Sequence, residues 1–239
     1  LKEYYLYAIK LDPKNYTQRK YHKGLDETLG THLALAFLYL DLEMSNDLFI
    51  SFWFTSNTDR QHEFISFIGR HILSNHSSDD KKFLSENLFI KDKLLALWGW
   101  TLKNRSINDP KIFAAFGYWI NEDEPVLSDK KVIKLLEKTL KKSDGNIDNI
   151  HRFVKRITTF AKVDPSGTFD IITNYLLDQN NKFINADSRR YFSYEEIKEA
   201  LTIIYSNVEI NNKKKIIKLI NILLKEGGST FWGFKEVLE

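Results

Sequence analysis

Residues 94–102 read LLALWGWTL, and this stretch decides which fold the chain adopts. With about 100° of rotation per residue in an α-helix, Trp98 and Leu102 lie on the same side as Leu94. Trp100 falls on another side, so the helix would be apolar on two faces. A helix exposed to water along one side would not carry this pattern. We therefore predict an inner helix that packs between two neighbours.

Two further stretches repeat the pattern. Residues 111–120 read KIFAAFGYWI, and residues 63–73 read EFISFIGRHIL. In the first, Phe113 and Phe116 share one apolar stripe of a helix, and Trp119 lies off it. Aromatic side chains at helical spacing are usually buried against neighbouring elements. We interpret these rings as core packing, and a stacking site for a base or a sugar is the alternative.

Helical periodicity recurs along the whole chain, and no segment alternates like a strand flanked by hairpin signals. Ser, Thr, Asp or Asn precedes the apolar segments and supplies an acceptor for the free N–H groups at a helix start. Gly227–Gly228 would end the last helix. The expected helices cover about 31–44, 58–74, 91–103, 129–142, 148–162, 168–178, 193–207 and 211–226, with shorter ones after 45–47 and after 109–110.

Ten or so helices joined by short loops favour stacked helix pairs. Pairs would begin near residues 111, 147 and 194, and this irregular spacing excludes a strict repeat. We predict an all-α fold, an irregular α-solenoid of stacked helix pairs of the HEAT or TPR kind. A single helical-repeat domain would span residues 1–239. Because the chain opens on Leu1 rather than Met, we expect it to be the C-terminal fragment of a longer multidomain protein.

The composition is that of a globular chain, with 43% hydrophobic and 28% charged residues. The net charge of +3 is too balanced to argue for nucleic acid or membrane from the total alone. The absence of cysteine excludes disulfides and cysteine metal sites and fits a reducing cytoplasm. No apolar run is long enough to span a bilayer, and no signal peptide is visible. We expect a cytoplasmic protein that does not contact the membrane.

The sequence offers no positive support for catalysis. His62–Glu63 begins like a zinc-protease helix, but no second histidine follows at the required spacing. The chain contains no phosphate-binding loop, no dinucleotide fingerprint and no nucleophile elbow. We predict a fragment that is not an enzyme and has no cofactor, no metal site and no catalytic residue.

One charged feature stands out in the helix expected at 129–142. Its lysines gather on the side opposite the apolar residues, and the next helix adds further basic side chains. A long loop near 180–192 carries two arginines. Such a surface suits phosphates or an acidic protein patch, and the plainer interpretation is a solvated outer face. The candidate interaction residues are Lys130, Lys134, Lys138, Lys141, Arg152, Lys155, Arg156, Arg189 and Arg190.

Several of these strings resemble a known group of proteins. FISFIGRHIL, LLALWGWTL and FAAFGYWI, followed by DPSGTFDIITNYLLD, YEEIKEALTIIYS and KKIIKLINILLKEGGSTFWGFKEVLE, are similar to the C-terminal helical repeats of large bacterial STAND-type NTPases. The resemblance covers about residues 28–239. It implies a sensor domain of antiviral defence, which captures a viral or other foreign protein and relays this to attached NTPase and effector domains.

Two functional hypotheses follow. The first is a non-catalytic, protein-binding α-solenoid that senses a protein ligand and acts on the rest of its own longer chain. The second, from another class, is a nucleic-acid-binding helical repeat that uses the basic stripe at 130–162. The resemblance favours the first.

Overall fold

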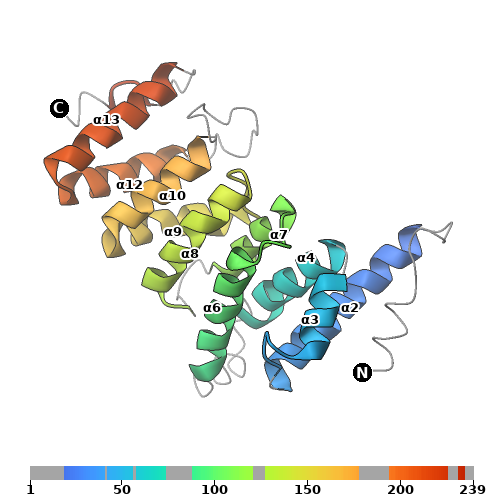
Figure 1. Cartoon of the computed structure of the whole chain (residues 1–239). Helices are drawn as coiled ribbons and strands as arrows, with labels where there is room; N and C mark the ends of the chain where they lie inside the picture. Colours follow the sequence, from blue (N-terminus) through green and yellow to red (C-terminus); the bar gives the residue numbers. More distant parts are fainter. Residues whose placement is uncertain are drawn as a thin grey trace. The chain divides into compact units, whose positions relative to one another are not determined.

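The computed structural model describes residues 19–40, 42–55, 58–73, 88–120, 127–177, 194–225 and 231–234 (Figure 1). All of the elements in these ranges are helical, which confirms the predicted all-α class. The chain divides into two compact units, Leu1–Trp119 and Ile120–Glu239. A single repeat domain over residues 1–239 stays a prediction.

Within its described residues, the first unit contains four longer helices, two short ones and a π-helix. They are α2 (Arg19–Tyr39), α3 (Asp47–Thr55), α4 (Thr58–Phe67), the π-helix η2 (Ile68–Leu73), α6 (Leu88–Lys103), α7 (Pro110–Ala114) and the 3-10 helix η3 (Ala115–Trp119). Helix α2 packs against α4, and α4 packs against α7 and η3.

Aromatic rings in contact with one another form part of the core of this unit. Trp98 of α6 is fully buried and stacks on Phe116 of η3, with the ring centroids 4.8 Å apart and an interplanar angle of 2°. On the other side of α6, Trp100 meets the rings of Phe49 and Trp53 from α3 edge-on. Helix α6 therefore packs between two neighbours, as its two apolar faces predict.

Trp119 corrects the sequence-based interpretation. An ideal α-helix places it off the stripe of Phe113 and Phe116, yet it is buried and its Nε1 donates a hydrogen bond to the carbonyl of Ile65 over 2.8 Å. The reason is that the chain tightens to a 3-10 helix at Ala115–Trp119, which rotates each residue further about the axis.

Two glycines explain other differences from the expected helices. Helix α2 begins well before residue 31, because Gly30 continues the helix at its contact with α4. A Cβ there would lie 2.6 Å from the carbonyl oxygen of Arg60. The helix expected over 58–74 changes into the π-helix η2 at Ile68, and Gly69 of this π-helix lies against Tyr118. A Cβ on Gly69 would lie 2.6 Å from the backbone oxygen of Tyr118.

In the part of the second unit that the structure describes there are five α-helices. They are α8 (Asp129–Lys142), α9 (Ile150–Val163), α10 (Pro165–Leu176), α12 (Tyr194–Asn207) and α13 (Ile210–Lys225), which lie within a residue or two of most predicted bounds. Helix α10 packs on α8, α9 and α12, while α12 also packs on α9 and α13. The predicted cap Asp164 accepts a hydrogen bond from the backbone N–H of Gly167 over 2.9 Å.

Among the described helices, none is both long enough and apolar enough to cross a lipid bilayer. The Gly227–Gly228 signal expected after the last helix lies outside the described residues.

Trp98→Ala should lower the free energy of unfolding by about 3–5 kcal/mol, because it leaves a cavity between α6 and η3. The control is Trp232→Ala, since Trp232 is 75% exposed and its loss should change stability by no more than about 0.5 kcal/mol. Urea unfolding followed by circular dichroism measures both. Equal midpoints for the two variants would show that Trp98 is not a core residue.

Gly69→Ala should cost about 1–3 kcal/mol, because the new methyl group overlaps the backbone of Tyr118. Gly24→Ala is the matched control. Its Cβ would meet nothing within 4 Å, so the higher helix propensity of alanine should raise stability by about 0.5–1 kcal/mol. Thermal unfolding shows whether each variant raises or lowers the melting temperature. A higher melting temperature for Gly69→Ala would contradict the close approach of Gly69 to Tyr118.

Candidate functional site

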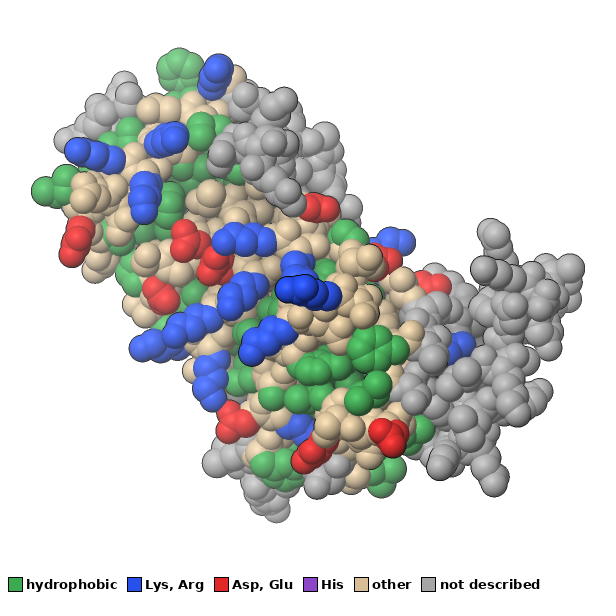
Figure 2. Space-filling model, in the orientation of Figure 1, with side chains coloured by type: hydrophobic (Ala, Val, Ile, Leu, Met, Phe, Trp, Pro, Cys, Tyr) green, Lys and Arg blue, Asp and Glu red, His purple; other side chains and the backbone are tan. Residues whose placement is uncertain are grey.

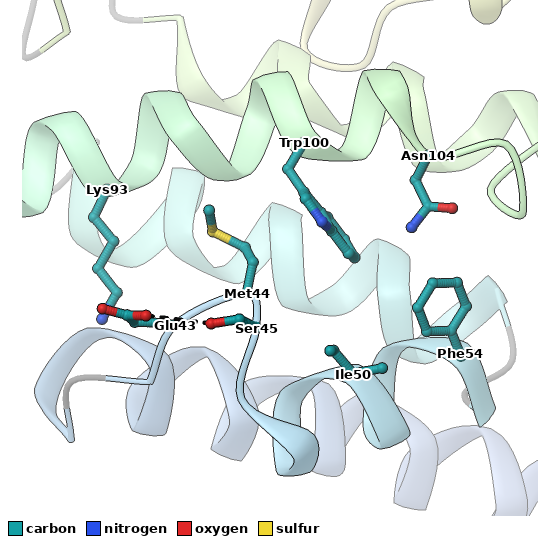
Figure 3. Close-up of a pocket in the computed structure, with 8 residues that line it drawn as sticks. All are labelled: Glu43, Met44, Ser45, Ile50, Phe54, Lys93, Trp100 and Asn104. Atoms are coloured by element: carbon teal, nitrogen blue, oxygen red, sulfur yellow. Dashed lines mark hydrogen bonds between the residues drawn. The ribbon is translucent and has the colours of Figure 1, made fainter.

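A pocket of 680 Å³ opens in the first unit between the loop after α2, helix α3 and helix α6 (Figure 3). Lys93 and Trp100 of α6, and Asn104 directly after this helix, point toward it from one side. The α2–α3 loop and α3 supply the opposite side. Figure 2 shows hydrophobic side chains gathered over α3 and α6 on this face of the unit. The remaining lining residues are Glu43, Met44, Ser45, Ile50 and Phe54.

The aromatic wall of the pocket follows from the spacing WGW. Trp98 and Trp100 are two positions apart on α6, so their side chains leave the helix on nearly opposite sides. Trp98 enters the core, whereas Trp100 is only half-buried. Its ring centroid lies 5.6 Å from that of Phe49 and 6.2 Å from that of Phe54. The buried contacts hold Trp100 in place while part of its surface faces the pocket.

Phe54 is the most exposed aromatic residue of the wall, with 46% of its surface accessible. On α3 it lies nearly opposite the buried ring of Phe52, two positions earlier, and about 100° around the helix from the buried ring of Trp53. Exposing a phenyl ring to water is unfavourable, and the neighbouring Ile50 and Met44 extend the apolar surface. The wall is therefore an apolar surface that another molecule can bury.

Polar side chains line one end of the pocket. The Nζ of Lys93 donates to the carbonyl oxygen of Phe37 over 2.7 Å and lies 4.5 Å from the centroid of that ring. The Oγ of Ser45 donates to the carboxylate of Glu43 over 3.2 Å, as Figure 3 shows. These contacts fix a positive and a negative group beside the apolar wall.

The sequence pattern alone does not reveal this pocket. Helical periodicity places Trp100 on the second apolar face of its helix, but it contains no information on how much of that face a neighbour covers. The sequence does contain one sign of the pocket. Phe54 ends the stretch DLFISFWF, whose apolar residues are too closely spaced to lie on one buried stripe of a helix.

The second candidate surface is the basic face of α8, where Figure 2 shows Lys and Arg side chains gathered. The buried face of this helix consists of Val132, Ile133, Leu136, Thr139 and Leu140. The lysines predicted on the opposite side are exposed, and they are Lys130, Lys134, Lys138 and Lys141. On α9, Lys155 is exposed and Arg152 is half-buried.

Arg156, which the sequence predicts as an interaction residue, is buried and does not belong to this surface. Only 5% of the residue is exposed, and its guanidinium forms an ion pair with the carboxylate of Asp129 at 2.5 Å. The guanidinium carbon also lies 5.7 Å from the ring centroid of Phe160. Arg156 therefore ties α9 to the first turn of α8 and is not available to a ligand.

Acidic groups lie close to Lys141 at the end of α8. Its Nζ forms an ion pair with Glu137 at 2.6 Å. Burial and the nearby carboxylate of Glu137 raise the pKa of Asp170, while the ammonium groups of Lys141 and Lys215 act in the opposite direction. This end of α8 is a region of mixed charge.

Arg189 and Arg190 lie outside the described residues, as does the whole loop expected at 180–192. In the part of the chain that the structure describes, no group of three or more His, Asp or Glu side chains is arranged to hold a metal ion. The expected absence of metal, cofactor and catalysis stays a prediction.

Arg156→Ala should lower the free energy of unfolding by about 3–5 kcal/mol, because it leaves the mostly buried carboxylate of Asp129 without its partner. Lys141→Ala breaks the exposed pair with Glu137 and should cost no more than about 0.5 kcal/mol. The double variant Asp129→Asn/Arg156→Met should recover part of the loss. Denaturant unfolding compares the three, and equal effects of the two single variants would refute the anchoring role.

Comparison of the chain with protein-family models, with curated proteins and with solved structures finds no match.

Proposed function

We propose that this chain is a non-catalytic, protein-binding helical domain, the sensor part of a larger defence NTPase of the STAND type. Its partner would be a protein, and binding would act on the rest of its own longer chain. The resemblance of its helical strings to the C-terminal repeats of such proteins supports the larger context. The pocket between α3 and α6 is the single observation that supports protein binding.

The chemistry of this pocket is that of a protein interface. Aromatic residues and methionine are enriched at the centres of such interfaces, where they bury an apolar side chain of the partner. Trp100, Phe54 and Met44 supply this surface, and Glu43 and Lys93 supply a polar edge. The partner's contribution would be a large apolar side chain with polar groups beside it.

The length of the lined surface favours a peptide segment over a small molecule. Its lining residues run from Lys93 on α6 to Asn104, whose backbone N–H donates a hydrogen bond to the carbonyl of Trp100 just past the end of the helix, and eleven helical steps span about 16 Å. An extended peptide advances about 3.3 Å per residue, so about five residues would cover this distance. We infer that a short apolar segment of the partner lies along α6, with its anchor side chain beside Trp100.

The proposal extends to the arrangement of the helices. In the second unit, α8 packs on α10 and α9 packs on α12, so helices that are two steps apart along the described elements lie in contact. This is the neighbour pattern of stacked helix pairs, and it supports an irregular solenoid. Solenoids present extended surfaces to protein ligands, in agreement with the proposed binding function.

A random peptide library displayed on phage, selected against the chain, tests the proposal. We expect enriched peptides with a conserved Leu, Met, Phe or Trp anchor and micromolar affinity. Phe54→Ser should weaken their binding at least tenfold, because it removes an exposed wall of the pocket without touching the core. Binding should change little between low and moderate salt, since apolar burial dominates.

Phe89→Ser is the matched control, because Phe89 is also exposed, at 57%, and does not line the pocket. It should leave peptide affinity unchanged. Circular dichroism establishes that both variants are folded. Peptides that bind equally well to the Phe54→Ser chain, or a library without enrichment, would refute the proposal. Binding of small aromatic fragments at Phe54 without any peptide binding would refute it as well.

A further inference from the structure

Three lysines on α8 form a straight row on the exposed side of the helix. Lys130, Lys134 and Lys138 are spaced four residues apart, so successive side chains project about 6 Å further along the helix axis. All three are exposed. Within the described residues, the structure gives their ammonium groups no ion pair and no hydrogen bond.

The acidic residues of the same helix do not neutralise this row. Asp129 faces inward and is paired with Arg156 at 2.5 Å. Glu137 is paired with Lys141, one turn beyond the row, at 2.6 Å. Both carboxylates of α8 are thus engaged elsewhere, and the row keeps its full positive charge.

This arrangement is unfavourable for the isolated helix. Like charges four residues apart repel each other, and Lys130 lies in the first turn, where the helix dipole disfavours a cation. The buried residues on the opposite side hold α8 against α10 and α9, so the three lysines stay on the exposed side of the helix. A bound anion with evenly spaced charges would relieve it.

We propose that Lys130, Lys134 and Lys138 bind the phosphate backbone of a nucleic acid without regard to base sequence. Ammonium groups on flexible side chains contact phosphates as point charges, and evenly spaced contacts suit a repeating backbone. The row contains no arginine for bidentate base contacts and no aromatic side chain for base stacking. The apolar face of α8 is buried, so the helix has no exposed apolar stripe with which to enter a lipid surface.

The site is separate from the α3–α6 pocket in its residues and in its physics. It binds by charge and by the release of counterions, so its affinity must fall steeply as salt rises. This inference therefore does not depend on the proposed protein-binding function, and the two can fail independently.

The proposal is tested by fluorescence anisotropy with labelled 20-nucleotide oligonucleotides of arbitrary sequence, at several salt concentrations between 50 and 200 mM. A duplex and a single strand of equal length separate the two forms of nucleic acid. We expect binding to at least one form, with little dependence on sequence. In Lys130→Gln/Lys134→Gln/Lys138→Gln the slope of log affinity against log salt should fall by about 2.7 for a duplex or about 2.1 for a single strand, three contacts being lost.

The control Lys111→Gln/Lys214→Gln/Lys225→Gln removes the same charge from three exposed lysines that do not form a row. It should keep the slope of the unmodified chain. A row variant that is folded by circular dichroism and binds with unchanged slope would overturn the proposal. So would the absence of binding at 50 mM salt, or binding to phosphatidylserine vesicles or to a poly-glutamate peptide without binding to nucleic acid.

Discussion

The first unit depends on helix α6 being covered on two sides by different neighbours. The parallel stack of Trp98 on Phe116 fixes one side of the helix against η3, and the hydrogen bond from Trp119 to Ile65 connects η3 to α4. With that side fixed, the rotation of α6 is determined, and Trp100 must point toward α3. The aromatic wall of the pocket therefore follows from the core packing, and it lines the pocket because α3 covers Trp100 only in part.

The helical class and most helix bounds could be predicted, because apolar periodicity and cap residues are local properties of the sequence. The bounds of α8 agree with the prediction, and Asp109 caps α7 by accepting a hydrogen bond from the N–H of Lys111. The 3-10 helix at Ala115–Trp119 and the π-turn at Ile68–Leu73 could not be predicted. Both form where elements distant in sequence approach closely, as at Gly69 and Tyr118. Helix propensity depends on neighbouring residues in the sequence and does not predict such a contact.

The candidate sites divide in the same way. Periodicity correctly placed Lys130, Lys134 and Lys138 on the exposed face of α8, because their positions depend only on the helix and its apolar side. Periodicity failed for Arg156, whose place in the interior depends on Asp129, a partner twenty-seven positions away. Periodicity makes no statement about the exposure of Phe54, because the exposed fraction of an apolar residue depends on which neighbour covers it. Charge runs are therefore predictable as surfaces, whereas individual charges and apolar patches are not.

Both proposed sites lie on helix faces that the core does not require. The buried residues of α8 and the inward rings of α3 stabilise their units, while the lysine row and Phe54 are each a cost to the folded chain in isolation, through repulsion between like charges or through exposed apolar surface. Such residues lower the stability of the chain and are not needed for its packing. We therefore expect their presence to be explained by a contact with another molecule. The two costs are relieved by different chemistry, since an apolar side chain does nothing for the lysines and a phosphate does nothing for Phe54. The physical character of each surface therefore specifies its own class of partner.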